Sequence, residues 1–393
     1  MTSVPLATAA MTAEDRPLSI LHVTNGSDAG GLSRYIFDLS CAMHERGHKV
    51  AVAGQRGAWH WLFEKAPFPW IEIPAKGGPL SALKSAATLK RYLQDHPADI
   101  LHTHYRRGTL IARRVQKQMQ ALRVEMPVLY TLHLSHIAIG WPQRVFSDFG
   151  DHTHVASEQA RRWLVDDAHI DPSRITLIPH GIDPTHYALA DDATRAAARQ
   201  SLGLSADARV AAYVGRLDYP KNVDWILDLA EVSRQKLPDL KLLLVGEGPK
   251  EAELRHAVES RKLGDRVTFL GHRDPLSIYQ AIDALLLPSL REGFSLVTAE
   301  AMSVGTTALR TRTSGTGELV IEDETGVSTP IDRDAFVKTA VDFLADRARL
   351  RRMGLAAAEH VRRSFTMEQQ LARTEALYRQ LARPTADASR ARR

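Results

Sequence analysis

The sequence of 393 residues has little cysteine and lacks long hydrophobic runs. Cys41 is its single cysteine, which excludes an internal disulfide and a cysteine-based zinc cluster and favours a reducing cytoplasm. No run of 18 uncharged apolar residues is present, so we expect no membrane-spanning helix. Residues 1–17 lack a basic stretch followed by an apolar core, and we expect a disordered tail there rather than a secretory signal.

The composition is that of a globular chain, with 44% hydrophobic and 25% charged residues. Its net charge is +5, but residues 346–393 hold twelve arginines against five acidic residues, so the remaining chain is close to neutral. This basic end could bind an anionic membrane surface or phosphates, or it could be a solvated helix face followed by a tail. The near-neutral body and the lack of interleaved aromatic residues argue against nucleic acid as a partner. We expect a cytoplasmic protein, with a peripheral position at the inner face of the membrane as an option.

Short apolar runs alternate with amphipathic stretches along the chain, and this alternation starts afresh near residue 206. Nearly continuous apolar strands separated by helices indicate parallel sheets covered on both faces. We therefore predict an α/β fold with two doubly wound Rossmann-like lobes and a ligand cleft between them. The predicted parts are a tail (1–17), an N-terminal lobe (18–183), a linker with a helix (184–205), a C-terminal lobe (206–362), a helix packing back on the N-terminal lobe (363–383) and a disordered tail (384–393).

Glycine turns follow several predicted strands, where open α/β sheets bind their ligands. Gly30 and Gly31 follow the first strand and open a helix, an arrangement that suits a phosphate but is also common in plain tight turns. Arg216 and Lys221 follow the first strand of the second lobe and could clamp a diphosphate, or could be two solvated cations. Gly246 lies in a third such turn.

Residues 285–302 form the most specific stretch of the sequence. A buried strand ends near Pro288, a loop presents Glu292, and a helix beginning near Ser295 carries Glu300. The backbone amides of 293–295 would point toward an anion, and Glu300 could reach the hydroxyls of a ribose. The alternative is that Glu292 and Glu300 are salt-bridge partners.

Together these motifs resemble retaining glycosyltransferases of family 4, which have the GT-B fold. The resemblance covers about residues 18–382 and is strongest over 210–326. It also includes the Gly-Gly-Leu-Ser-Arg motif from Gly30, the stretch 178–183 and Gly315-Thr-Gly-Glu318. It implies transfer of a hexose from a nucleotide-diphosphate sugar to an acceptor hydroxyl, with UDP-sugars favoured and GDP-mannose as another option. The donor is a substrate, so no cofactor and no metal is expected.

The resemblance also implies roles for individual residues. The catalytic group would be His133 near the sugar, Arg216 and Lys221 on the diphosphate, and Glu292 on the donor sugar. Glu300 would bind the ribose, and His272 and Arg273 would frame the base. The remaining donor-binding positions are Gly30, Gly31, Gly246, Gly293, Phe294, Ser295 and Leu296. The N-terminal lobe would bind the acceptor. The basic C-terminal helix and four arginines of that lobe, Arg106, Arg107, Arg113 and Arg114, favour an anionic or lipid-linked acceptor, although such pairs could also be the exposed face of a helix.

Four departures from the family pattern concern the predicted sugar and phosphate pocket. Leu134, His180, Ser295 and Ser314 stand where the family often has Asp, Asn, Gly or Pro, and Gly, respectively. They bear on which sugar is bound rather than on the fold. Two alternatives remain, a nucleotide-sugar 2-epimerase of the same fold and a non-catalytic binding protein. Many histidines flank strands, and a zinc site built from His102, His104, His152 and His154 is a further, less favoured hypothesis.

Overall fold

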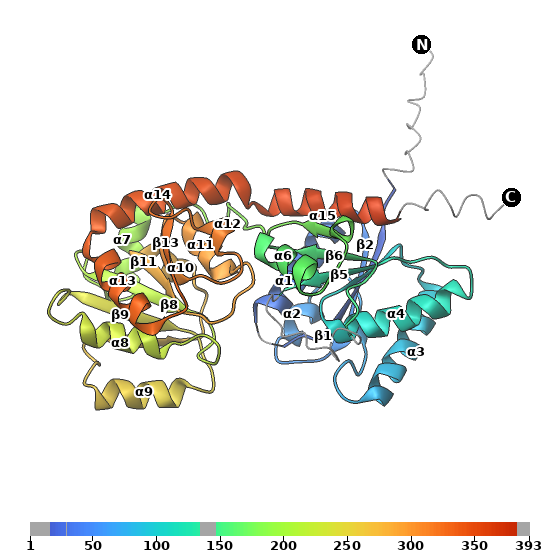
Figure 1. Ribbon diagram of the computed structural model, residues 1–393, viewed down its shortest axis with the longest axis horizontal. Helices are drawn as coiled ribbons and strands as arrows, with labels where there is room; N and C mark the ends of the chain where they lie inside the picture. Colours follow the sequence, from blue (N-terminus) through green and yellow to red (C-terminus); the bar gives the residue numbers. More distant parts are fainter. Residues whose placement is uncertain (1–15, 29, 134–146, 383–393) are drawn as a thin grey trace, which may run out of the picture. The chain divides into compact units, whose positions relative to one another are not determined.

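The computed structural model describes residues 16–28, 30–133 and 147–382 (Figure 1). The chain forms two compact units. Unit 1 comprises residues 1–131, 145–154 and 371–393, and unit 2 comprises 132–144 and 155–370. Nearly all of the two predicted tails, 1–17 and 384–393, lies outside the described residues. Over the part of the chain that is described, no helix is both long enough and apolar enough to cross a bilayer.

Residues 19–177 form a sheet with the strand order β3-β2-β1-β4-β5-β6-β7. Its strands are β1 Ser19–Gly26, β2 Lys49–Gln55, β3 Trp70–Glu72, β4 Ile100–Thr103, β5 Val128–Leu132, β6 His152–Val155 and β7 Ile175–Leu177. The helices of this half are α1 Gly31–Glu45, α2 His60–Glu64, α3 Pro79–Asp95, α4 Arg106–Gln120 and α6 Glu158–Asp166. Apolar side chains of α3 and α4 cover one face of the sheet around Leu21 and Val23.

Unit 2 contains a six-stranded parallel sheet with the order β10-β9-β8-β11-β12-β13. Its strands are β8 Arg209–Val214, β9 Leu240–Val245, β10 Val267–Gly271, β11 Ala284–Leu287, β12 Thr307–Thr311 and β13 Gly326–Thr329. The helices that follow α6 are α7 Asp192–Ser201, α8 Asp224–Val232, α9 Glu251–Ser260, α10 Leu276–Ala281, α11 Leu296–Ser303, α12 Thr316–Leu319, α13 Arg333–Ala345, α14 Arg347–Ser364 and α15 Met367–Ala382.

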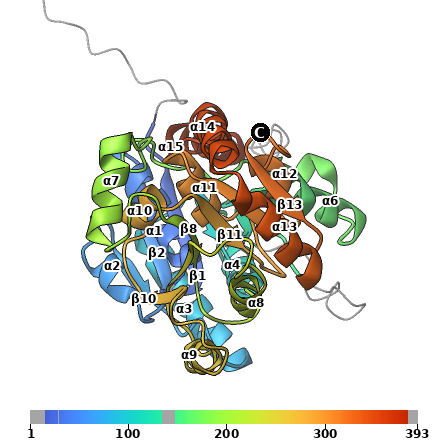
Figure 2. The ribbon, with the colours of Figure 1, turned by 90° about the vertical axis from the view of Figure 1, so that its left-hand side faces the viewer.

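Alternate residues of these strands enter two separate cores. Tyr213 and Leu244 pack with α8, α9 and α13 on one face, whereas Val214 and Val245 pack with α10 and α11 on the other (Figure 2). Both faces are buried, which explains why the strands read as continuous apolar runs. The prediction of an α/β fold with two doubly wound sheets is confirmed. Helix α14 and strand β13 were not predicted as separate elements.

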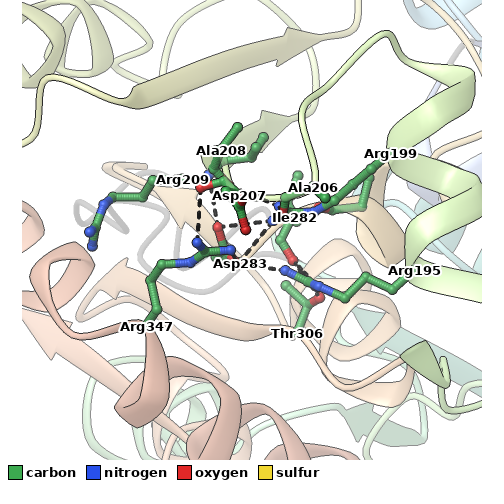
Figure 3. A network of polar contacts seen from close by, with 12 residues as sticks. Arg195, Arg199, Ala206, Asp207, Ala208, Arg209, Ile282, Asp283, Thr306 and Arg347 are labelled. Atoms are coloured by element: carbon green, nitrogen blue, oxygen red, sulfur yellow. Dashed lines mark hydrogen bonds and ion pairs between the residues drawn. The ribbon is translucent and has the colours of Figure 1, made fainter. Parts of the chain in front are cut away.

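A polar network lies at the amino edge of this second sheet (Figure 3). The carboxylate of Asp283 pairs with Arg195 at 2.5 Å and Arg199 at 3.1 Å, both on α7, and with Arg347 on α14 at 3.8 Å. Arg199 is almost fully buried and also donates to the carbonyl oxygens of residues 206, 208 and 281. Asp283 therefore links α7 and the start of α14 to the amino edge of the sheet. The predicted motifs lie at the opposite, carboxyl edge.

Candidate functional site

The carboxyl ends of the strands of unit 2 collect most of the predicted site residues. Arg216 and Lys221 follow β8, Gly246 follows β9, and His272 and Arg273 follow β10. The loop after β11 holds Glu292, Gly293, Phe294 and Ser295, and α11 then begins at Leu296 and carries Glu300. Because all six strands are parallel, these loops share one edge of the sheet, which is where α/β proteins bind ligands.

Close backbone contacts hold the first three of these loops together. Gly215 N donates to Val245 O at 2.9 Å, and Gly246 N donates to Gly271 O at 2.9 Å. Gly246 has φ +127°, and a Cβ added there would lie 2.0 Å from Gly215 O. Only glycine fits this position, so its role in the structure is to let two loops approach each other.

Lys221 and Glu292 form an ion pair between the loops after β8 and β11. The Lys221 ammonium donates to Glu292 Oε1 at 2.6 Å, and the hydroxyl of Ser289 donates to the same oxygen at 2.6 Å. Leu290 N reaches Pro220 O at 2.8 Å and joins the two backbones as well. Glu292 is therefore buried and charge-compensated, with its carboxylate held beside a cation that could bind phosphate.

Arg216 is the more accessible of the two predicted phosphate ligands. Its side chain is 61% exposed and pairs with Asp218. The hydroxyl of the buried Tyr213 donates to Arg216 O at 2.7 Å and fixes the backbone from which the guanidinium extends. Both cations are thus paired with a carboxylate. An incoming diphosphate would either displace Asp218 and Glu292 from Arg216 and Lys221 or bind these two cations together with the carboxylates.

The turn at 293–295 leads into helix α11. Ser295 has φ +64°, a left-handed conformation that fits the glycine often found there in the family, and its hydroxyl pairs with Thr298 Oγ1 at 2.9 Å. A Cβ added to Gly293 would lie 2.2 Å from the carbonyl oxygen of His133. This contact places the backbone of His133, another predicted site residue, directly against the turn.

The rings of His133 and His180 are stacked, with centroids 5.9 Å apart. His180 in turn contacts the buried Phe294 edge-on at 5.7 Å. The structure therefore brings His133, His180 and the 293–295 turn together within unit 2. A sugar contact by His133 stays a prediction.

Glu300 projects from α11 toward a tyrosine. The Tyr279 hydroxyl, on α10, donates to Glu300 Oε2 at 2.8 Å. Burial, together with the nearby Glu300, raises the pKa of Tyr279 well above its usual value, so the phenol stays protonated and acts as the donor. This bond orients the carboxylate predicted to bind ribose.

The other predicted residues take part in other contacts. His272 N donates to Glu247 Oε1 at 3.4 Å, and Arg273 Nε donates to Leu270 O at 3.1 Å. Gly30 and Gly31 belong to unit 1, where α1 begins at Gly31. Asp28, in the loop just before them, pairs with Lys76 at 2.7 Å.

Sequence reasoning missed three residues that bond predicted site residues: Asp218, Tyr279 and Ser289. Asp218 and Ser289 lie within motifs that had been singled out, two or three residues from a predicted ligand, so proximity was a usable signal. Tyr279 had none, because an apolar-stripe residue of a short helix reads as core until its hydroxyl finds a partner.

Three buried histidines in unit 1 lie close enough together to hold a metal ion. One nitrogen from each of His22, His102 and His104 falls within 4.8 Å of the others, and this group differs from the one hypothesised from the sequence. The rings are engaged in hydrogen bonds instead. His22 Nδ1 lies 2.9 Å from His104 Nε2, and His102 bonds the hydroxyls of Tyr378 and Thr131, each at 2.6 Å. We interpret the group as a polar network in the core.

The arginines proposed for an anionic acceptor are largely used by the fold. Arg113 pairs with Asp148 at 2.9 Å and also with Asp151, and Arg107 donates to Ala75 O at 2.6 Å and Gly78 O at 2.9 Å. Among the described residues of the basic C-terminal part, ion pairs are formed by Arg347, Arg349, Arg351, Arg362 and Arg379. Binding of an anionic membrane surface stays a prediction.

Comparisons with known proteins agree with this geometry. The family model described as "Glycosyl transferases group 1" matches residues 194–360, and that of "Glycosyltransferase Family 4" matches 29–186. The chain is 29% identical over 375 residues to the D-inositol 3-phosphate glycosyltransferase of Nocardia farcinica, covering 85% of this chain and 81% of that one. It is 28% identical over 305 residues to the N-acetyl-alpha-D-glucosaminyl L-malate synthase of Bacillus anthracis, covering 75% and 78%.

Solved structures agree on the fold. The Anabaena HepE protein, crystallised in complex with UDP, superposes with a TM-score of 0.79 at 19% identity, over 92% of this chain and 99% of that one. Sucrose-phosphate synthase from Thermosynechococcus elongatus gives a TM-score of 0.76 at 24% identity, over 92% and 99%. Two Rossmann-like sheets, the loops at their carboxyl edges and both family models lead to one conclusion: the chain belongs to the family 4 glycosyltransferases and has the GT-B fold.

Proposed function

We propose that this glycosyltransferase moves a hexose from a nucleotide-diphosphate sugar, with a UDP-sugar favoured over GDP-mannose, to an acceptor hydroxyl with retention of the anomeric configuration. The observation that carries the proposal is the Lys221–Glu292 ion pair beside Arg216 and the 293–295 turn. In this arrangement two cations and the start of a helix lie near a carboxylate that can accept hydrogen bonds from sugar hydroxyls. The UDP found in HepE supports a uridine nucleotide.

The chemistry follows from where charge develops. As the bond between the anomeric carbon and the phosphate oxygen breaks, the diphosphate leaves with the electron pair and gains negative charge. Arg216 and Lys221 would stabilise that charge, and such preorganised stabilisation is commonly the largest catalytic contribution. The acceptor oxygen attacks the same face of the sugar and passes its proton to the departing phosphate, so no protein nucleophile is needed.

We propose that this leaving-group stabilisation is independent of a metal ion. The support is in the two cations that stand at the strand ends. An Asp-x-Asp motif, Asp332-Arg333-Asp334, does follow β13, but Asp332 caps helix α13 by accepting a hydrogen bond from Ala335 N at 2.8 Å. We propose that His133 contacts the sugar near the 293–295 turn, since its carbonyl oxygen already approaches Gly293.

We also propose an anionic acceptor. The names of two relatives specify a phosphorylated inositol and malate as their acceptors, and both molecules carry negative charge beside a hydroxyl. In unit 1, Lys76 is a partly exposed cation at the carboxyl edge of the sheet, paired with Asp28. It is a group that an anionic acceptor could engage.

Thermal denaturation with a panel of UDP, GDP, ADP and their common sugars tests the donor assignment. A ligand present at about 100 times its dissociation constant stabilises the folded protein by ~2.7 kcal/mol, which gives a measurable shift. We expect a shift with one nucleoside diphosphate and its sugars, reduced in Glu300→Gln. Glu324→Gln, on the exposed turn before β13, is the matched control and should shift like the wild type. No shift with any nucleotide from folded protein would contradict the proposal.

A further inference from the structure

Arg310, on β12, is among the largest fully buried side chains of the described residues. Its Nη2 donates to Thr313 Oγ1 at 2.9 Å and to Ser314 O at 3.1 Å, while its Nε and Nη1 have no hydrogen-bond partner. Burying a guanidinium with two of its nitrogens unpartnered costs free energy, and such exceptions call for an explanation. None of the roles proposed so far uses this residue.

The surroundings of Arg310 connect it to the candidate donor site. The loop that it holds, 312–315, packs directly on the turn after β11, because a Cβ added to Gly315 would lie 2.6 Å from Phe294 Cα and 2.7 Å from Gly293 O. Burial lowers the pKa of Arg310 to about 10, and Glu292 and Glu318 act against that shift. The guanidinium is therefore charged at neutral pH and interacts electrostatically with these two carboxylates.

Two cations thus act on Glu292, and their side chains differ in how far they can move. Lys221 is partly exposed, pairs with Glu292 at 2.6 Å, and would be drawn toward a donor diphosphate. Arg310 is buried and hydrogen-bonded to Thr313 and Ser314, so it cannot move toward the diphosphate as Lys221 can. When Lys221 turns to the phosphate, Arg310 remains as the resident positive charge near Glu292, whose burial would otherwise leave an undercompensated carboxylate.

We propose that Arg310 is a positioning residue of the donor site, which holds the 312–315 loop and keeps Glu292 charged and in place beneath the donor sugar when Lys221 engages the diphosphate. This inference rests on the proposed function. The family positions named from the sequence do not include residue 310, so Arg310 would be an additional positioning residue of the same site.

The experiment compares Arg310→Met, which removes the charge at similar length, with Arg310→Lys, which retains it. Arg266→Met is the matched control, because Arg266 is also buried in unit 2 with an unpartnered Nε and bonds Ser233 Oγ at 3.1 Å and Leu237 O at 2.7 Å, just before β10. For each variant, Tm, the Kd for UDP and the kcat and KM for the active UDP-sugar are measured.

We expect Arg310→Met to lower kcat about tenfold or more, equivalent to at least ~1.4 kcal/mol of transition-state stabilisation, with the Kd for UDP changed less than about threefold. Arg310→Lys should recover most of kcat, and Arg266→Met should lower Tm while keeping kcat. Loss of kcat in proportion to Tm in both Met variants, or no loss in Arg310→Met, would overturn the assignment.

If Arg310→Met does not fold, Arg310→Lys and Arg310→Gln decide the question. Wild-type kcat in both variants, or an equal loss in both, would overturn a role for the charge. A wild-type protein that neither binds UDP nor turns over any UDP-sugar would contradict the proposed function, an outcome distinct from an active wild type with an equally active Arg310→Met.

Discussion

The Tyr279 hydroxyl donates a 2.8 Å hydrogen bond to Oε2 of Glu300. Tyr279 is fully buried, so its hydroxyl holds one oxygen of the carboxylate at the edge of the core. A residue of the core, Tyr279, therefore orients Glu300, the residue predicted to bind the ribose.

Replacing Tyr279 with Phe should therefore weaken nucleotide binding without a change in the binding residues themselves. A hydrogen bond to a charged group contributes about 1.5–3 kcal/mol, and we expect UDP affinity to fall several-fold as Glu300 loses its orientation. Titration calorimetry with UDP measures this loss. Tyr378→Phe is the control, since Tyr378 is equally buried and bonds His102 in unit 1. Equal UDP affinities in the two variants would refute the coupling.

Asp218→Asn should strengthen binding of the nucleoside diphosphate. The substitution removes the carboxylate that neutralises Arg216, so the phosphate no longer competes with it. Arg216 is largely exposed, and exposed pairs contribute about 0–1 kcal/mol, so the gain should not exceed about fivefold and should shrink at high salt. Asp323→Asn, which breaks the pair with Arg349, should leave UDP affinity unchanged. Weaker UDP binding in Asp218→Asn would show that Asp218 supports the site instead of competing with the ligand.

Gly293→Ala should impair turnover far more than its size suggests. The added Cβ would lie 2.2 Å from the backbone oxygen of His133, so either the turn or that strand end must move. Small displacements of catalytic groups are costly, and we expect kcat/KM to fall by at least about tenfold. Gly264→Ala adds a Cβ that meets nothing within 4 Å and serves as the control in the same steady-state assay. Normal kcat/KM in Gly293→Ala would mean that the contact is not needed.

The histidine network of unit 1 predicts acid sensitivity. Burial lowers the pKa of His22 from 6.5 to about 3, so as the pH falls below 6.5 the unfolded chain takes up a proton that the folded state does not. The free energy of unfolding should therefore decrease between pH 6.5 and 3, and His22 alone should account for about 2 kcal/mol between pH 7.5 and 5. Urea denaturation of wild type and His22→Gln at both values checks this. An unchanged pH dependence in the variant would show that His22 is not responsible.

Much of the fold could be predicted because its strands are buried on both faces. Runs such as 284–287 and 241–245 contain almost nothing but apolar residues, and their spacing by helices left parallel sheets as the natural interpretation. Helix α14 was harder to recognise because its apolar stripe, which includes Leu350, Met353 and Ala357, is interrupted by arginines. Four of them lie near its start: Arg347, Arg349, Arg351 and Arg352.

The candidate site could be predicted in composition but not in its pairings. Lys221 and Glu292 were both named, yet they are 71 residues apart, and nothing in their local sequence says that they meet at 2.6 Å. The same limit applies to Arg310. A lone arginine in an apolar strand gives no sign that its charge acts on Glu292, because that depends on the loops after β11 and β12 packing together.

Helix α15 has a practical consequence for anyone who wishes to study the two halves separately. The chain returns to unit 1 at Leu371, and there Glu375 binds Arg46 at 2.9 Å while Tyr378 bonds His102. An expression fragment ending at residue 183 would lack those partners and expose the buried histidines that they cover. A separable first half must be made by joining residues 371–382 back to it, for instance through a short linker or as a peptide added in trans.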